Sequence, residues 1–169
     1  MRISVRIWLL ALGLLILAAG QPALATAQFP DVLIYEGKEH SLFSNPLESY
    51  YGPDRPRPQF KMWHTANYRG YVATWEIDKG MLYLKKIKAR LEGKEVGLDY
   101  LFPGNKGRVA ATWFTGTLRV PQGKQLHYVH AGYRSVYEQE LILTLKDGKV
   151  TNKEVIDNRD KVKKDIKEK

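Results

Sequence analysis

Aromatic and basic side chains alternate in one stretch of this sequence, a combination that can recognise flat or anionic ligands. Seven aromatic residues fall between Tyr50 and Trp75, with basic residues interleaved among them. Aromatic faces beside guanidinium groups form platforms for sugars, small rings or stacked bases. The aromatic residues are Tyr50, Tyr51, Phe60, Trp63, Tyr68, Tyr71 and Trp75, and the basic ones are Arg55, Arg57, Lys61 and Arg69.

The position of each ring relative to the nearest strand separates a binding surface from a protein core. Tyr71 and Trp75 lie in strand register and are expected in the core, whereas the residues just before that strand are free to recognise a ligand. A second aromatic group, which includes Tyr133, lies near His130. The expected ligand is an envelope saccharide, a small aromatic compound or another protein. We predict the ligand-binding residues to be Trp63, His64, Tyr68, Arg69, His130 and Tyr133.

The histidines form no recognisable metal or catalytic motif. His127 and His130 would share a face on a helix, but their surroundings predict strand or loop. Zinc sites need three or four ligands, so we predict no metal and no cofactor. Residues 132–136 lack the Gly-x-Ser-x-Gly pattern, and residues 103–107 lack phosphate-loop spacing. The alternative function is a hydrolase that pairs His64 or His130 with a carboxylate, because distant acids can converge in space.

A third function class comes from charge. The net charge of +9 falls to +7 when Arg2 and Arg6 are removed. Such a surplus suits an anionic surface, although acids are interleaved along most of the chain and a merely solubilising surface is the simpler interpretation. We expect no specific nucleic-acid partner. A polyanion-binding or structural envelope protein would use the densest basic group, which is Lys85, Lys86, Lys88 and Arg90.

The clearest predicted elements are two consecutive strands that would position these residues. Gly70–Asp78 alternates, with Tyr71 and Trp75 on the core side, and residues 78–80 form a turn. Met81–Leu91 returns as the second strand. The odd-numbered residues of this strand, among them Ile87, are predicted to face the core.

The remaining segments complete an all-β pattern. About seven or eight strands separated by regular turns predict a single antiparallel β-sandwich or a partly open barrel. No segment is a good candidate for a long helix. The further predicted elements are a hairpin over 31–43, a helical turn capped by Asn45, a loop over 52–58, a strand over 108–120 closed by a turn at 121–124, and a hairpin of strands 137–145 and 149–156.

The first 27 residues read as a secretory signal peptide. Arg2 and Arg6 precede an apolar run of 13 residues from Ile7 to Ala19, and small residues at 23–27 offer a cleavage site. This run is shorter than the roughly 20 residues that a bilayer-spanning helix needs, which favours a cleaved signal peptide. The alternative is a retained N-terminal anchor. The chain contains no cysteine, so neither disulfides nor a lipid-modified N-terminal cysteine are available.

This organisation predicts a periplasmic or secreted protein with one domain. We expect residues 1–27 to be the signal peptide, 28–158 the β-rich domain and 159–169 a charged C-terminal tail. The domain is expected to be a monomer.

One segment resembles a group of uncharacterised bacterial proteins. Arg69–Ile77, Arg-Gly-Tyr-Val-Ala-Thr-Trp-Glu-Ile, is its most specific part, and similar sequences often carry tryptophan where this chain has Tyr68. The matching residues span roughly Leu33 to Asp157 and include 44–48, 128–133 and 135–138. The resemblance implies one whole domain, and it implies no catalytic residue because no activity is known for the group.

Overall fold

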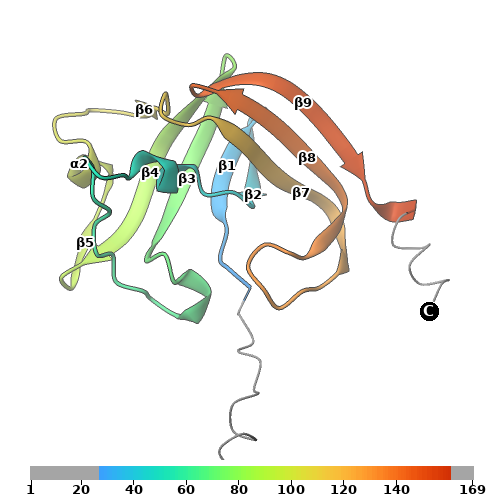
Figure 1. Ribbon diagram of the computed structural model, residues 1–169, viewed down its shortest axis with the longest axis horizontal. Coiled ribbons are helices and arrows are strands. Elements are labelled where there is room, and N and C mark those ends of the chain that lie inside the picture. The colour runs from blue at the N-terminus through green and yellow to red at the C-terminus, as the bar shows by residue number, and fades with distance from the viewer. Residues whose placement is uncertain (1–26, 161–169) are drawn as a thin grey trace, which may run out of the picture.

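The computed structural model describes residues 27–160, which form an all-β fold with a single nine-stranded sheet (Figure 1). The strand order is β2-β1-β3-β4-β9-β8-β7, with β5 and β6 also paired to β4, and the sheet is not closed. Its strands are β1 (Asp31–Tyr35), β2 (Lys38–Leu42), β3 (Tyr71–Asp78), β4 (Met81–Leu91), β5 (Lys94–Val96), β6 (Val109–Ala110), β7 (Gly116–His127), β8 (Val136–Lys146) and β9 (Lys149–Asp157).

Helical structure between β1 and β9 is short: η1 (Pro46–Tyr50), η2 (Thr65–Asn67) and α2 (Leu98–Leu101). The predicted helical turn after Asn45 is therefore confirmed. Asn45 occupies its N-cap position but makes no capping hydrogen bond. The predicted signal peptide and charged tail lie outside the described residues, apart from Ala27, Arg159 and Asp160.

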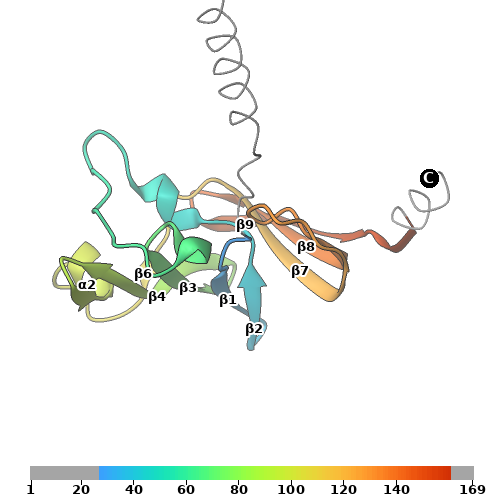
Figure 2. The ribbon, with the colours of Figure 1, turned by 90° about the horizontal axis from the view of Figure 1, so that it is seen from below.

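The strand group around β3 and β4 meets the strand group around β7 and β8 where the β3–β4 turn contacts the β8–β9 turn. The β4–β9 ladder is a single bridge between Met81 and Lys149, reinforced by the amide of Leu82 on the carbonyl of Gly148 at 2.9 Å. Figure 2 shows the β3–β4 side and the β7–β8 side on opposite flanks, with β1 and β2 between them. The two edge strands, β2 and β7, do not form a ladder with each other, but the amide of Phe43, just after β2, donates to the carbonyl of Arg119 in β7 at 2.8 Å.

The expectation of a purely antiparallel sheet is wrong for one strand pair. β1 runs parallel to β3, with Leu33 opposite Trp75, because the long segment between β2 and β3 returns the chain to the same end of the sheet. Every other ladder is antiparallel.

The core lies between the inward faces of the two strand groups. Tyr71, Ala73 and Trp75 alternate along β3 and are fully buried, as their spacing predicts. The inward positions of β7 and β8 supply five further core residues. These residues are Leu118, Val120, Leu141, Leu143 and Leu145.

A β-bulge in β4 corrects the predicted facing of that strand. Thr74 pairs with Lys86 but Trp75 pairs with Leu84, so Lys85 is an extra residue. Leu82 and Leu84 therefore face the core before the bulge, whereas Ile87 and Ala89 face it afterwards. The prediction of uniformly odd-numbered core residues was wrong before the bulge and right after it.

The predicted strand over 108–120 is also corrected. It is interrupted between β6 and β7, so that Gly116 begins a strand and does not interrupt one. The predicted turn at 121–124 does not form, because β7 continues to His127 through register shifts against β8. Gly123 adopts a φ of 74° there, which lets an irregular strand absorb a turn-like sequence.

Candidate functional site

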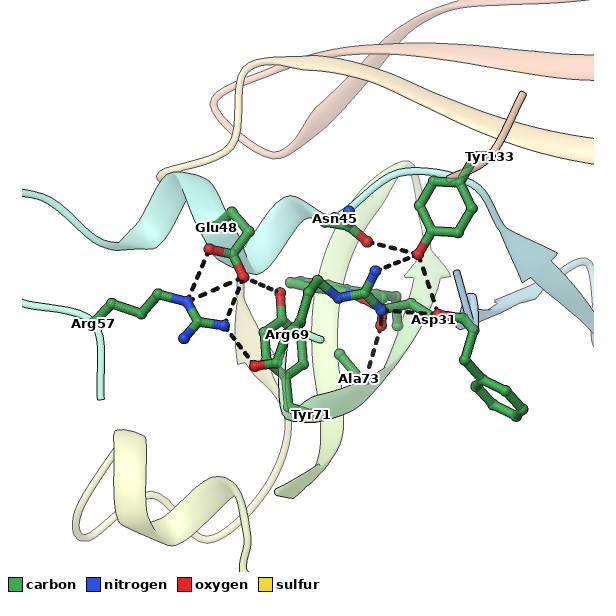
Figure 3. Close-up of polar contacts among 10 residues, drawn as sticks. Asp31, Asn45, Glu48, Arg57, Arg69, Tyr71, Ala73 and Tyr133 are labelled. Atoms are coloured by element: carbon green, nitrogen blue, oxygen red, sulfur yellow. Dashed lines mark hydrogen bonds and ion pairs between the residues drawn. The ribbon is translucent and has the colours of Figure 1, made fainter. Parts of the chain in front are cut away.

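Asp31 is a fully buried carboxylate whose two oxygens are both hydrogen-bonded (Figure 3). Its Oδ1 accepts hydrogen bonds from the amide of Ala73 and from Nη2 of Arg69, each at 3.1 Å. Its Oδ2 accepts one from the indole Nε1 of Trp75 at 3.1 Å. These contacts connect the start of β1 to β3 and to Arg69, two residues before β3.

Arg69 is the counter-ion of Asp31, and it is only 3 % exposed. Burial raises the pKa of Asp31 from 3.8 to about 6, although the positive charge of Arg69 and two hydrogen bonds oppose that rise. A buried ion pair gains little net stability from its own attraction, because both groups lose their hydration. We therefore interpret the Asp31–Arg69 pair as a structural contact that connects β1 to the segment before β3.

The remaining donors of Arg69 reach two further segments. Nη2 also donates to the carbonyl of Phe29 at 3.1 Å, and Nη1 donates to the hydroxyl of Tyr133. That hydroxyl in turn donates to Oδ1 of Asn45 at 3.0 Å. Nε of Arg69 is buried without a hydrogen-bond partner among residues 27–160.

Glu48 organises a second group of polar side chains beside the first (Figure 3). It accepts hydrogen bonds from Tyr71 at 2.8 Å and from Nε of Arg57 at 3.1 Å. Arg57 also donates to the carbonyl of Arg69 at 2.6 Å. The proline-rich loop over 52–58 is thereby fastened to the start of β3.

The Arg69 cleft, a cavity of about 330 Å³, lies over both groups. Its charged side chains already pair with protein groups, as described above for Glu48 and both arginines. A ligand there would have to compete with these internal contacts. The residues that line it are Asn45, Glu48, Arg57, Tyr68 and Arg69.

The Trp63 groove is a second and larger cavity, of about 440 Å³. It lies between the loop before β3 and the outer part of the β4–β5 hairpin. The amide of Lys61 donates to the carbonyl of Arg90 at 2.7 Å, which holds this loop against β4. The residues that line the groove are Trp63, Lys86, Ile87, Lys88, Ala89, Glu95, Val96 and Gly97.

The charge of the Trp63 groove is predominantly positive. Lys86 and Lys88 are exposed and have no ion pair within residues 27–160, whereas Glu95 lies 3.6 Å from Arg90. Trp63 is 39 % exposed, so part of its ring is available to a ligand. An exposed indole beside two unpaired ammonium groups can stack on a ring and attract a negative charge.

The six predicted ligand-binding residues do not form one site. Trp63 lines the groove named after it, while Tyr68 and Arg69 line the Arg69 cleft, with Tyr133 hydrogen-bonded to Arg69. The two remaining residues, both histidines, lie outside these cavities, with the ring of His64 against Phe29 and that of His130 against Tyr128.

One residue of the predicted aromatic site lies near part of the predicted basic face. Trp63 lines the same groove as Lys86 and Lys88, which periodicity alone does not indicate. Asp31 was missed as a partner of Arg69. Its shared parity with Leu33 was the available signal, because an inward-facing carboxylate requires buried donors.

In the described part of the chain, the side chains of His64 and His130 contact aromatic residues and no carboxylate. The ring of His64 packs against Phe29, and Nδ1 of His130 lies 3.5 Å from the hydroxyl of Tyr128. Within residues 27–160, no three His, Cys, Asp or Glu side chains lie close enough together to hold a metal ion. The described residues thus offer aromatic and charged groups that can bind a ligand.

Fold and site together define an all-β protein with one open sheet that carries the Trp63 groove and the Arg69 cleft on its surface. No protein-family model, no curated protein and no solved structure matches this chain. Within residues 27–160 no helix is long and apolar enough to cross a bilayer.

Proposed function

We propose that this protein is an exported, non-catalytic binding module that takes an anionic saccharide in the Trp63 groove. The observation that carries the proposal is the juxtaposition of the exposed Trp63 ring with Lys86 and Lys88 along a cavity of about 440 Å³. The indole would stack on a sugar face, and the lysines would bind its carboxylate, sulfate or phosphate groups.

The Trp63 groove supports binding better than the Arg69 cleft does. In the cleft, Glu48 and Arg57 bind each other, and Arg69 is held by Asp31. Breaking such contacts to admit a ligand would leave a buried charge unpaired. The lysines of the groove need not give up an internal ion pair.

Export is a separate part of the proposal. The apolar run from Ile7 to Ala19 after two arginines supports a signal peptide, and the absence of cysteine is compatible with a periplasmic or secreted location. We further propose a monomer whose sheet is a partly open barrel. The hydrogen bond between Phe43 and Arg119 across the two outer strands supports the latter.

Isothermal titration calorimetry with a uronic-acid oligosaccharide tests the binding proposal. Trp63→Ala should weaken binding about tenfold or more, the effect of losing one stacking contact. Lys86→Gln with Lys88→Gln should also weaken binding and should reduce its dependence on salt. A neutral oligosaccharide of similar length should bind much more weakly.

Two controls separate the groove from general effects. Lys146→Gln with Lys149→Gln removes the same charge at the exposed turn between β8 and β9 and should leave the affinity unchanged. Trp63→Phe should retain part of the affinity because it keeps a ring. Unchanged binding in both the Trp63→Ala protein and the Lys86/Lys88 double variant would exclude the groove as the site.

A further inference from the structure

One end of the molecule gathers three segments that are far apart in sequence. The amide of Phe29 donates to the carbonyl of Ala66 at 2.6 Å, and the amide of Gln28 donates to the carbonyl of Gly132 at 3.1 Å. Figure 1 shows the entry of the described chain at the bottom, between the loop before β3 and the loop after β7. We call this the loop end; it comprises Phe29 and residues 61–69 and 127–134.

The loop end exposes an unusual amount of apolar surface. Phe29, Met62 and Tyr128 are each 51 % exposed, and Tyr68 is 63 % exposed. Single exposed rings are common on proteins, but several on adjoining loops mark an interaction surface.

The two loops of this end carry positive charge without acidic residues. No aspartate or glutamate occurs from Arg55 to Trp75, nor from Tyr100 to Tyr137. Lys61 and Arg134 are exposed on these loops. The outward charge of both loops is therefore positive, although Glu39 borders Phe29 on the β2 side.

The chain enters the fold at this same end. Residue 27 pairs with Gly132, so the preceding segment, which contains the apolar run Ile7–Ala19, joins the domain beside the exposed rings. With the export proposed above, the protein would be made with this end next to a membrane-targeting sequence.

We propose that the loop end docks on the surface of a phospholipid bilayer that contains anionic headgroups. The rings of Phe29, Tyr68 and Tyr128 enter the headgroup layer, where amphipathic aromatic side chains are favoured. Lys61 and Arg134 bind the negative surface, and the two contributions add.

A bilayer fits these residues better than a soluble polyanion does. A polyanion would engage the cations but would gain little from Phe29 and Met62, which offer only apolar surface. A lipid interface uses both kinds of group at once. This docking uses side chains other than those that line the Trp63 groove, although Trp63 lies on the same loop over residues 61–69.

Flotation with vesicles tests the docking. The purified protein, its N-terminus determined by mass spectrometry, is mixed with phosphatidylcholine vesicles that contain or lack phosphatidylglycerol. It should float with the anionic vesicles, and Lys61→Gln with Arg134→Gln should reduce the partition coefficient about 30-fold. Tyr68→Ser with Tyr128→Ser should reduce it about tenfold. Tyr100→Ser removes a 46 % exposed tyrosine from α2 and should have no effect.

Hydrogen exchange gives a readout that does not depend on the preceding segment. Anionic vesicles should slow exchange in residues 61–69 and 127–134 of the unmodified protein and not in the Tyr68/Tyr128 variant. That variant should still bind the uronic-acid oligosaccharide, which shows that it is folded. Equal flotation with neutral vesicles, unchanged exchange in both loops, or capture by dextran sulfate without flotation would each overturn the proposal.

Discussion

Arg69 illustrates how a residue with the chemistry of a ligand contact can instead hold a fold together. It precedes the most distinctive strand and is flanked by aromatic residues, and these features predict recognition at the surface. In the structure its guanidinium group binds Asp31 in β1, the carbonyl of Phe29 and the hydroxyl of Tyr133. A loss of ligand binding on its substitution would therefore report a loss of structure.

The role of Arg69 predicts a large loss of stability on its substitution. Arg69→Met leaves Asp31 buried without its counter-ion, so the free energy of unfolding should fall by about 3–5 kcal/mol. Arg108→Met removes an arginine that pairs with Glu76 and Asp78 at the surface, and should cost much less because these groups remain hydrated. Urea denaturation of both variants measures the difference. Similar costs for the two substitutions would contradict the buried-pair account.

Asp31 also predicts a specific pH dependence. Burial raises its pKa in the folded state to about 6, whereas the unfolded chain should release this proton near 3.8. The folded state therefore holds the proton over this window, and its stability falls as the pH rises through it, by about 3 kcal/mol from this group. Asp31→Asn cannot titrate and lacks this change.

The measurement is the difference in unfolding free energy between the unmodified protein and Asp31→Asn. That difference should move in favour of the variant between about pH 4 and pH 7. Other carboxyl groups titrate in both proteins and cancel. A difference that stays constant between pH 4 and pH 7 would contradict the raised pKa of Asp31.

At the scale of elements, the bulge in β4 decides which lysines are available. If β4 were a regular strand with Lys85 paired like its neighbours, Lys86 and Lys88 would face the core on the same side as Leu82 and Leu84. The bulge turns them outward and keeps Ile87 in the core. Sequence alternation predicts both strands of this hairpin but not the bulge, because an irregular register depends on packing across the whole sheet.

Gly70 marks a second constraint at this scale, since it connects the loop of Trp63 to β3. Its φ is 74°, and a Cβ there would lie 2.7 Å from the carbonyl oxygen of Phe60. Gly70→Ala should cost about 2–5 kcal/mol, from the backbone conformation and the clash together. Gly80→Ala has nearly the same φ of 76° with nothing within 4 Å, so it should cost only about 1–2 kcal/mol. Equal Tm values for the two variants would refute the close-approach argument.

The strands that the sequence predicts well are those whose two faces differ in polarity. β3 and the second half of β8 alternate in burial and end at glycine turns, and both strands are confirmed. β9 is confirmed as the returning strand of the hairpin, although most of its residues are exposed. β7 is longer than predicted, since a segment with Pro121 and Gly123 is held in the sheet by its partner β8. The parallel pairing of β1 with β3 depends on the path of the long connection, which local pattern does not encode.

At the scale of the whole molecule, the two surfaces proposed to bind different partners share the loop over residues 61–69. The Trp63 groove lies beside β4 and β5, and the loop end lies where the chain enters the fold. A protein that docks at the loop end would hold the groove close to the membrane surface. Four exposed cations lie on these two surfaces, Lys86 and Lys88 in the groove and Lys61 and Arg134 at the loop end, and they could attract the anionic partners proposed above.

Mapping amide chemical shifts during titration with the uronic-acid oligosaccharide distinguishes the Trp63 groove from the Arg69 cleft as the ligand site. The largest shifts should fall on the indole of Trp63 and on residues 86–89 and 95–97. Shifts centred on Asn45 and Tyr68 would place the ligand in the Arg69 cleft and contradict the proposal. A titration without shifts, at concentrations that saturate comparable saccharide sites, would contradict it as well.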